Sequence, residues 1–333
     1  MYVRRNIRWS LVWKFAWKNL IGFTVWATVV TAAYYLLLPR GVNVSIPFLP
    51  VSTIGIAVAF YVGFKNSQSY DRFWEARKIW GGIVNYSRTW ANQVLTYVDL
   101  DDWTDEERAH THRRLIYRHL AWINALRMQL RRTTMLERDN LSYVPDLKLE
   151  NDRECMFQIG AFLDDDEYAD VIRRVNADTH LVKNQGRALR QLVAWGALDV
   201  YRQVDMMGTL EELYNLQGKC ERIKNTPFPR QYAFFSSVFV WIFCLLLPLG
   251  LVGEFARLDG PTTVWMTVPF SVLISWVFVT IEVVGDNSED PFENYINDVP
   301  MSALCRTIEI DLRDMLDETE LPEKAQPEND ILM

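Results

Sequence analysis

The sequence predicts an all-α, polytopic membrane protein with four transmembrane helices in two hairpins and a large cytosolic helical bundle. Four stretches of the chain contain no charged residue, and they form two close pairs on either side of a long charged segment. A helix of about 20 apolar residues crosses a hydrocarbon core about 30 Å thick, so each stretch is long enough to span a bilayer. The four stretches are residues 20–38, 41–64, 231–253 and 260–281.

Basic residues gather at those ends of the stretches that adjoin the long charged segments. Five of them precede the first stretch with no acidic residue among them: Arg4, Arg5, Arg8, Lys14 and Lys18. By contrast, Arg40 is the one basic residue in the first hairpin turn. Because loops rich in Lys and Arg stay in the cytoplasm, we expect both termini and the middle segment on the cytoplasmic side of the cell inner membrane.

This pattern divides the chain into four segments. Residues 1–64 form an N-terminal segment and the first transmembrane hairpin, and residues 65–230 form a cytosolic helical domain. Residues 231–284 form the second hairpin, and residues 285–333 form a cytosolic C-terminal segment with an acidic tail.

Within the charged segments, the spacing of apolar residues predicts helices. Residues 69–97 are expected to continue the second stretch, and Thr104 with the three acidic residues after it starts a helix that runs to about Arg132. A loop is expected over residues 140–152, around Pro145. Further helices are expected over residues 164–175, 184–214 and 302–316, before a flexible tail over residues 317–333.

The composition excludes several classes of function. A net charge of −7 without a basic run argues against nucleic acid as a partner. The sequence has no phosphate-binding loop, nucleophile elbow or catalytic dyad, so we predict neither an enzyme nor a cofactor. The four cysteines form no CxxC pair and are expected to be reduced thiols. His110 and His112 do not face together on a helix, and neither they nor His119 are joined by an acid or a cysteine, so no metal site is predicted.

The second apolar stretch carries the most informative pattern. Ile56, Phe60 and Phe64 recur at every fourth residue and therefore lie on one face of a helix. Such a row can be a packing seam between helices. It can also be a hydrophobic constriction, since rings of apolar side chains gate ions by dewetting a narrow passage. Phenyl edges are partly positive, so two Phe rings presented edge-on would favour anions.

The motifs around the two hairpins resemble the bestrophin family of ion channels in its bacterial branch. The resemblance covers most of the chain and rests on the order of the matching segments as much as on any one of them. These segments are residues 13–18, 63–66, 69–77, 80–81, 90–91, 220–227, 289–292 and 305–312.

The resemblance implies a homopentamer in membrane lipid around one central pore, which passes small ions and favours anions such as chloride. In the family, three apolar positions of the second span form the neck of the pore. Counting back from Arg72 places them at Ile56, Phe60 and Phe64, the row that helical spacing selects independently. The family also has a second constriction at the cytosolic mouth, expected here near Leu181 or Val182.

One departure concerns calcium. Eukaryotic members carry an acidic run after a Pro-Phe pair, whereas this chain keeps only the dispersed carboxylates Asp290, Glu293 and Asp298 as candidates. Calcium needs several oxygen ligands close together, so we do not expect calcium activation. Two other functions stay open. The acidity of the middle segment is compatible with a cation-selective channel of the same architecture, and the segment's size with a non-conducting membrane sensor or scaffold.

Overall fold

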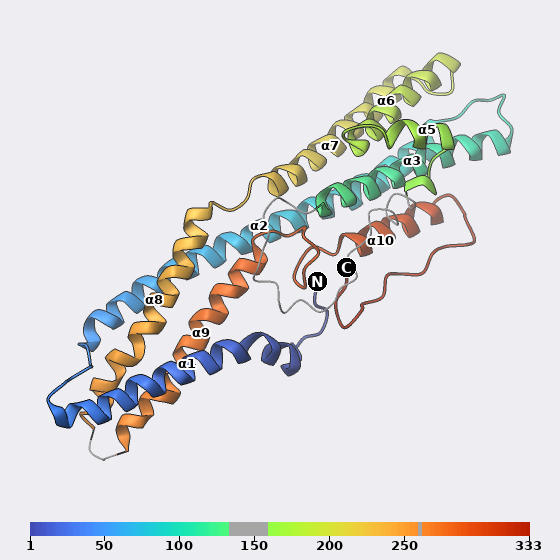
Figure 1. Ribbon diagram of the computed structural model, residues 1–333. Coiled ribbons are helices and arrows are strands. Elements are labelled where there is room, and N and C mark those ends of the chain that lie inside the picture. The colour runs from blue at the N-terminus through green and yellow to red at the C-terminus, as the bar shows by residue number, and fades with distance from the viewer. Residues whose placement is uncertain (133–158, 259–261) are drawn as a thin grey trace.

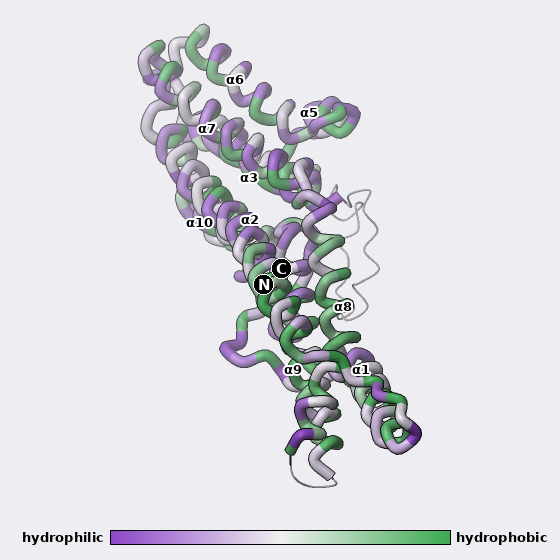
Figure 2. The backbone as a smooth tube through the Cα atoms, turned by 90° about the vertical axis from the view of Figure 1, so that its left-hand side faces the viewer, coloured by the Kyte–Doolittle hydropathy of each residue, from purple (hydrophilic) through white to green (hydrophobic). Residues whose placement is uncertain are grey.

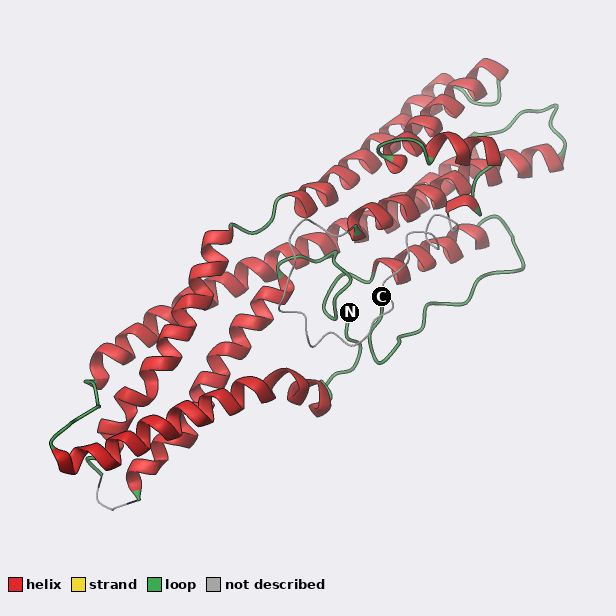
Figure 3. Cartoon of the chain, in the orientation of Figure 1, coloured by secondary structure: helices red, strands yellow, loops and turns green. Residues whose placement is uncertain are grey.

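The computed structural model describes residues 1–132, 159–258 and 262–333. These residues form long helices, and β pairing within them is limited to isolated bridges near the two ends of the chain (Figure 3). The molecule is elongated, with a bundle of apolar helices at one end and a bundle of polar helices at the other (Figures 1 and 2). The loop predicted over residues 140–152 lies outside the described residues.

The apolar bundle contains the four helices of the described residues that are long and apolar enough to cross a membrane, as the sequence predicts. The tube in Figure 2 is mostly green in this region. The four helices are α1 (Trp9–Leu37), α2 (Phe48–Tyr97), α8 (Arg230–Phe255) and α9 (Thr267–Ser288).

Helix α2 belongs to both bundles. It has 50 residues and is therefore about 75 Å long at 1.5 Å per residue, which confirms that residues 69–97 continue the second span. It begins at Phe48 instead of Gly41, because Asn43 accepts the Ser45 N–H at 2.9 Å in a turn and Pro47 precedes the first helical residue. The boundary expected after residue 64 falls inside this helix.

The polar bundle packs against the second half of α2. Its core contains the fully buried rings of Trp80, Trp90 and Trp122. The start of α3 is the predicted one, because Thr104 and Glu107 form a reciprocal capping box. The helices of this bundle are α3 (Asp105–Arg131), α5 (Asp165–Val171), α6 (Ala177–Trp195), α7 (Val200–Asn225) and α10 (Met301–Asp314).

Two predictions about this bundle are wrong. The helix expected over residues 184–214 is divided, because Gly196 takes a left-handed conformation (φ 81°) that ends α6. Asp199 then caps α7 by accepting the Tyr201 N–H at 2.8 Å. The end of the acidic tail is held in place: Ile331 is fully buried, and Asp330 lies 2.8 Å from Arg4 and 2.7 Å from Arg8. The two termini therefore lie together (Figure 1).

Candidate pore-lining helix

One face of α2 in the apolar bundle is apolar and uncovered. Ile56 is 73% exposed, Phe60 80% and Phe64 49%. The same face begins two helical turns earlier with Leu49, which is 76% exposed. On a helix long and apolar enough to cross a membrane, such a row can face lipid, a second copy of the chain or a passage that a single chain does not complete.

The opposite face of α2 is packed against α8 and α9. Val51, Val58 and Val62 are buried there, and Gly55 lies so close to Phe243 that a Cβ atom would come within 2.6 Å of its ring. Small residues allow helices to approach closely where lipid supplies no hydrophobic driving force between them. This packing directs the row of Ile56, Phe60 and Phe64 away from the chain.

A buried ion pair follows the row directly. Lys65 is 1% exposed, and its Nζ lies 2.7 Å from Glu282 Oε1 and 3.3 Å from Asp286 Oδ1, both on α9. Ser236 of α8 donates its hydroxyl to Glu282 Oε2 at 2.6 Å. Because a buried charge is tolerated only with partners, these contacts fix α2 to α8 and α9 one residue beyond Phe64. They also explain why α9 continues past residue 281, the predicted end of the fourth span.

Two turns further along α2, the Arg72 guanidinium joins this helix to the C-terminal ends of two others. It donates to the carbonyl oxygens of Ile223 (3.0 Å), Thr226 (2.9 Å) and Glu289 (2.8 Å). These carbonyls belong to the C-terminal ends of α7 and α9, where unpaired backbone acceptors and the helix dipole favour a cation. Arg72 therefore holds the junction between the two bundles.

In the sequence, Lys65 and Arg72 stand out only as positions in the family motifs at residues 63–66 and 69–77, and neither of these roles was predicted. The available signal was Lys65 directly after an apolar row, with Glu282 as an acid at the end of another span.

The comparison with known proteins agrees with this architecture. A sequence model of the family described as "Bacterial/Fungal Bestrophin protein" matches residues 5–314. The chain belongs to the bestrophin family. It is thus a membrane protein, as its four apolar helices indicate.

Relatives and solved structures match this bestrophin over nearly its whole length. A voltage-dependent anion channel-forming protein of Ralstonia nicotianae is 32% identical over 335 residues, which cover 98% of this chain and 97% of the relative. A voltage-dependent anion channel-forming protein of Escherichia coli K12 is 28% identical over 331 residues, which cover 98% of this chain and 95% of the relative. A crystal structure of a bacterial bestrophin homologue from Klebsiella pneumoniae has a TM-score of 0.75 at 27% identity, covering 91% of this chain and 98% of that one.

The predicted second constriction of this bestrophin does not match its structure. Leu181 and Val182 lie on α6 and are 0% and 2% exposed, within the core of the polar bundle. A side chain buried inside one subunit has no surface with which to narrow a passage. This burial contradicts the expected place of both residues at a cytosolic aperture.

The three calcium candidates lie in the segment between α9 and α10, and they already have protein partners. Lys224 Nζ lies 2.5 Å from Glu293, and Arg72 lies 3.6 Å from Asp290. Asp298 accepts the Tyr295 N–H at 3.0 Å, and burial raises the pKa of its carboxyl to about 7. Within the described part of the chain, no three His, Cys, Asp or Glu side chains gather as ligands for a metal ion.

The histidines of α3 are also engaged separately. His112 Nε2 lies 2.7 Å from the Val98 carbonyl oxygen, and His119 Nε2 lies 2.8 Å from Ser87 Oγ. Burial lowers the pKa of His119 to about 3, so this ring is neutral at physiological pH.

Proposed function

We propose that this chain is one subunit of an anion channel in which five copies surround a pore lined by α2. The observation that carries the proposal is the uncovered row of Ile56, Phe60 and Phe64, opposite a face of the same helix that is fully packed. A symmetric ring of copies turns this row into successive apolar rings around a shared axis. The number five comes from the resemblance to the bestrophin family.

The rings would control conduction physically, without a chemical reaction. A narrow passage lined by apolar side chains loses its water easily, which raises the free energy of an ion inside it. The partly positive edges of Phe60 and Phe64 reduce that cost more for an anion than for a cation. The names of the matched relatives, which are anion channel-forming proteins, support this choice.

The proposed orientation puts the polar bundle and both termini in the cytoplasm and the apolar bundle in the inner membrane. Exposed cations support it, because they gather where the two bundles meet: Arg5, Lys14 and Lys18 before and within α1, and Lys219 near the end of α7. Loops and helix ends rich in Lys and Arg stay on the cytoplasmic side. The polar bundle then surrounds an inner vestibule continuous with the neck.

The test is a recording of the purified protein in planar bilayers beside a Phe60→Ala, Phe64→Ala double variant. We expect conductance to rise about tenfold, the effect of a barrier lowered by ~1.4 kcal/mol, and selectivity to fall. The control is Val25→Ala with Val29→Ala, two exposed side chains at the same spacing on α1. This control should conduct as the unmodified protein does.

Reversal potentials measured in a chloride gradient show whether anions or cations permeate the channel. A potential that follows chloride supports the anion channel, whereas one that follows the cation supports the cation-selective alternative. The absence of ion flux from both the unmodified protein and the double variant would support the non-conducting scaffold instead.

A further inference from the structure

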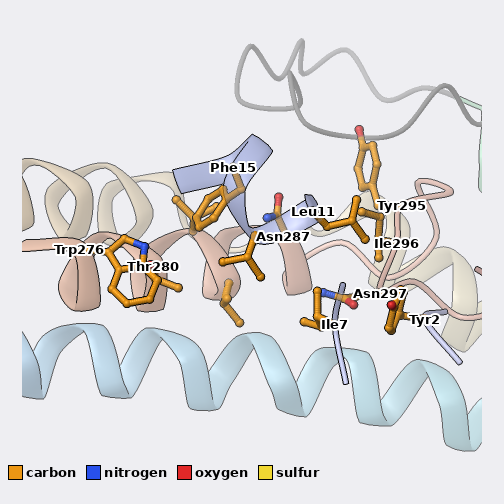
Figure 4. A pocket seen from close by; sticks show the side chains of 13 residues that line it. Tyr2, Ile7, Leu11, Phe15, Trp276, Thr280, Asn287, Tyr295, Ile296 and Asn297 are labelled. Atoms are coloured by element: carbon orange, nitrogen blue, oxygen red, sulfur yellow. The ribbon is translucent and has the colours of Figure 1, made fainter. Parts of the chain in front are cut away.

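A cavity of about 180 Å³ lies between the N-terminal half of α1 and the half of α9 nearest the polar bundle. Figure 4 shows side chains from both helices and from the loop that contains Tyr295 around it. Most of its wall is hydrocarbon, from Leu11 and Phe15 on α1 and from Trp276 and Val284 on α9. The cavity is separate from the proposed ion path, because none of its lining residues comes from α2.

Two polar atoms in this apolar wall lack partners. Trp276 Nε1 and Thr280 Oγ1 are buried and have no hydrogen-bond partner among the described residues. An indole N–H can only donate, and a hydroxyl can donate too. Leaving such groups unpaired in an apolar surrounding is costly. Both atoms are shielded from a water-sized probe, so the cavity itself presents hydrocarbon and fits an occupant that is mostly hydrocarbon.

The start of the chain beside the cavity carries cations that no carboxylate neutralises. Asp330 pairs with Arg4 and Arg8. Among the residues that the structure describes, no carboxylate lies in ion-pair contact with Arg5, Lys14 or Lys18, all of which are exposed. These cations favour an anionic group at the mouth of the cavity.

The outer face of the same stretch of α1 is aromatic. Trp9, Trp13 and Trp17 recur at every fourth residue and are 81%, 65% and 40% exposed. Exposed Trp rings of this kind are typical of the boundary between lipid headgroups and acyl chains. The cavity thus opens at the depth where a phospholipid changes from chain to headgroup.

We propose that this cavity binds one anionic phospholipid from the leaflet next to the polar bundle. One acyl chain lies between Phe15 and Trp276. The phosphate lies toward the exposed cations Arg5 and Lys14, on the side of Phe15 nearer the start of the chain. This lipid fastens α1 to α9 independently of whether the protein conducts ions.

Native mass spectrometry of the full-length protein, titrated with phosphatidylglycerol or phosphatidylcholine in mild detergent, tests the proposal. We expect saturable binding that prefers phosphatidylglycerol. Val284→Trp, at the exposed rim, should fill the cavity and abolish that binding. Val277→Trp is the matched control, since Val277 is also exposed on α9, two turns away, and does not line the cavity. It should bind as the unmodified protein does.

A second pair of variants tests the headgroup contacts. Replacing Arg5, Lys14 and Lys18 with Gln should reduce the preference for phosphatidylglycerol about fivefold per cation, while phosphatidylcholine binding stays the same. The control removes three exposed cations of α6 by Lys183→Gln, Arg187→Gln and Arg190→Gln, which gives the same net charge. This control should keep the preference.

Three results would overturn the proposal. They are equal lipid binding by the Val284→Trp and Val277→Trp variants, no preference for phosphatidylglycerol in the unmodified protein, and loss of the oligomer instead of the lipid in Val284→Trp. The last result would mean that a second copy of the chain fills the cavity. None of these readouts depends on conduction, so a failure of the proposed channel activity would be distinguishable.

Discussion

The two faces of α2 in the apolar bundle have opposite characters. On one face, Phe60 is 80% exposed although it is fully apolar. On the other, Lys65 is 1% exposed although it is charged. In a soluble helix the apolar face is buried and the charged face is wet. Within one subunit, α2 is therefore held by a satisfied ion pair on one side and left uncovered on the other.

The two faces of α2 also have different roles: one positions the helix, and the other is the proposed lining of the pore. The buried side, with Val58, Val62 and Lys65, determines where α2 lies relative to α8 and α9. The exposed side, with Ile56, Phe60 and Phe64, packs against nothing within the subunit and is therefore available for the proposed role in conduction. Substitutions on the two faces should therefore affect different measurements.

The largest effect is expected for Lys65→Met. This change leaves Glu282, which is 6% exposed, without its cation, and an uncompensated buried charge costs about 3–5 kcal/mol. Chemical unfolding of the purified protein in mild detergent should show that loss. Adding Glu282→Gln to Lys65→Met should recover most of it, since the unpaired charge is then removed.

Phe60→Ala is the control for the exposed face. Its unfolding free energy should stay within about 0.5 kcal/mol of the unmodified protein, as for ordinary surface substitutions. If Lys65→Met proved as mild as Phe60→Ala, the ion pair would not be what holds α2 to α9, and the contrast between the faces would fail.

A second buried carboxyl group belongs to Asp298, and no Lys or Arg side chain in the described part of the chain forms an ion pair with it. Burial is the main cause that raises its pKa to about 7, Glu293 raises it further, and the Tyr295 N–H and the Met1 amino group lower it. The folded protein therefore keeps a proton that the unfolded chain loses above about pH 4. Stability contributed by this group is complete below pH 4 and is lost as the pH rises through about 7.

Asp298→Asn should remove this pH dependence. Between pH 4 and 7, the unfolding free energy of the unmodified protein should fall relative to that of the variant by up to ~4 kcal/mol. Asp178, whose pKa burial raises to about 6, is common to both proteins and cancels in the difference. Parallel pH profiles for the two proteins would show that Asp298 titrates as an exposed carboxyl does.

Local patterns were sufficient to predict the helices and the row on α2. Charge-free stretches locate the spans, and the four-residue spacing of Ile56, Phe60 and Phe64 puts them on one face whatever the tertiary structure. The capping box at Thr104 is equally local. Which elements pack together is a different kind of information, and it explains what the sequence could not predict.

The missed ion pair and the burial of Leu181 and Val182 depend on partners far away in the chain, whereas the missed turn at Gly196 is local. Lys65 and Glu282 are 217 residues apart, and spacing within either helix says nothing about their pairing. The turn at Gly196 was missed because the helical spacing of apolar residues continues on both sides of it. The burial of Leu181 and Val182 follows from α6 packing against α3 and α7, which an alignment to a family motif does not reveal.

The smallest effect is expected for two glycines of α2, of which Gly55 is buried against α8 and Gly63 is exposed. A Cβ atom at Gly55 would lie 2.6 Å from Phe243, whose ring is itself held against Phe278 at 4.6 Å between centroids. Gly55→Ala should therefore lower the free energy of unfolding by about 1–3 kcal/mol through overpacking.

At Gly63 a Cβ atom meets nothing within 4 Å. Gly63→Ala should therefore raise the free energy of unfolding by up to about 1 kcal/mol through helix propensity. Unfolding of both variants in the same detergent measures the contrast. A similar loss in both would mean that the Gly63 side is also packed, which would favour a helix-packing seam over a water-filled axis.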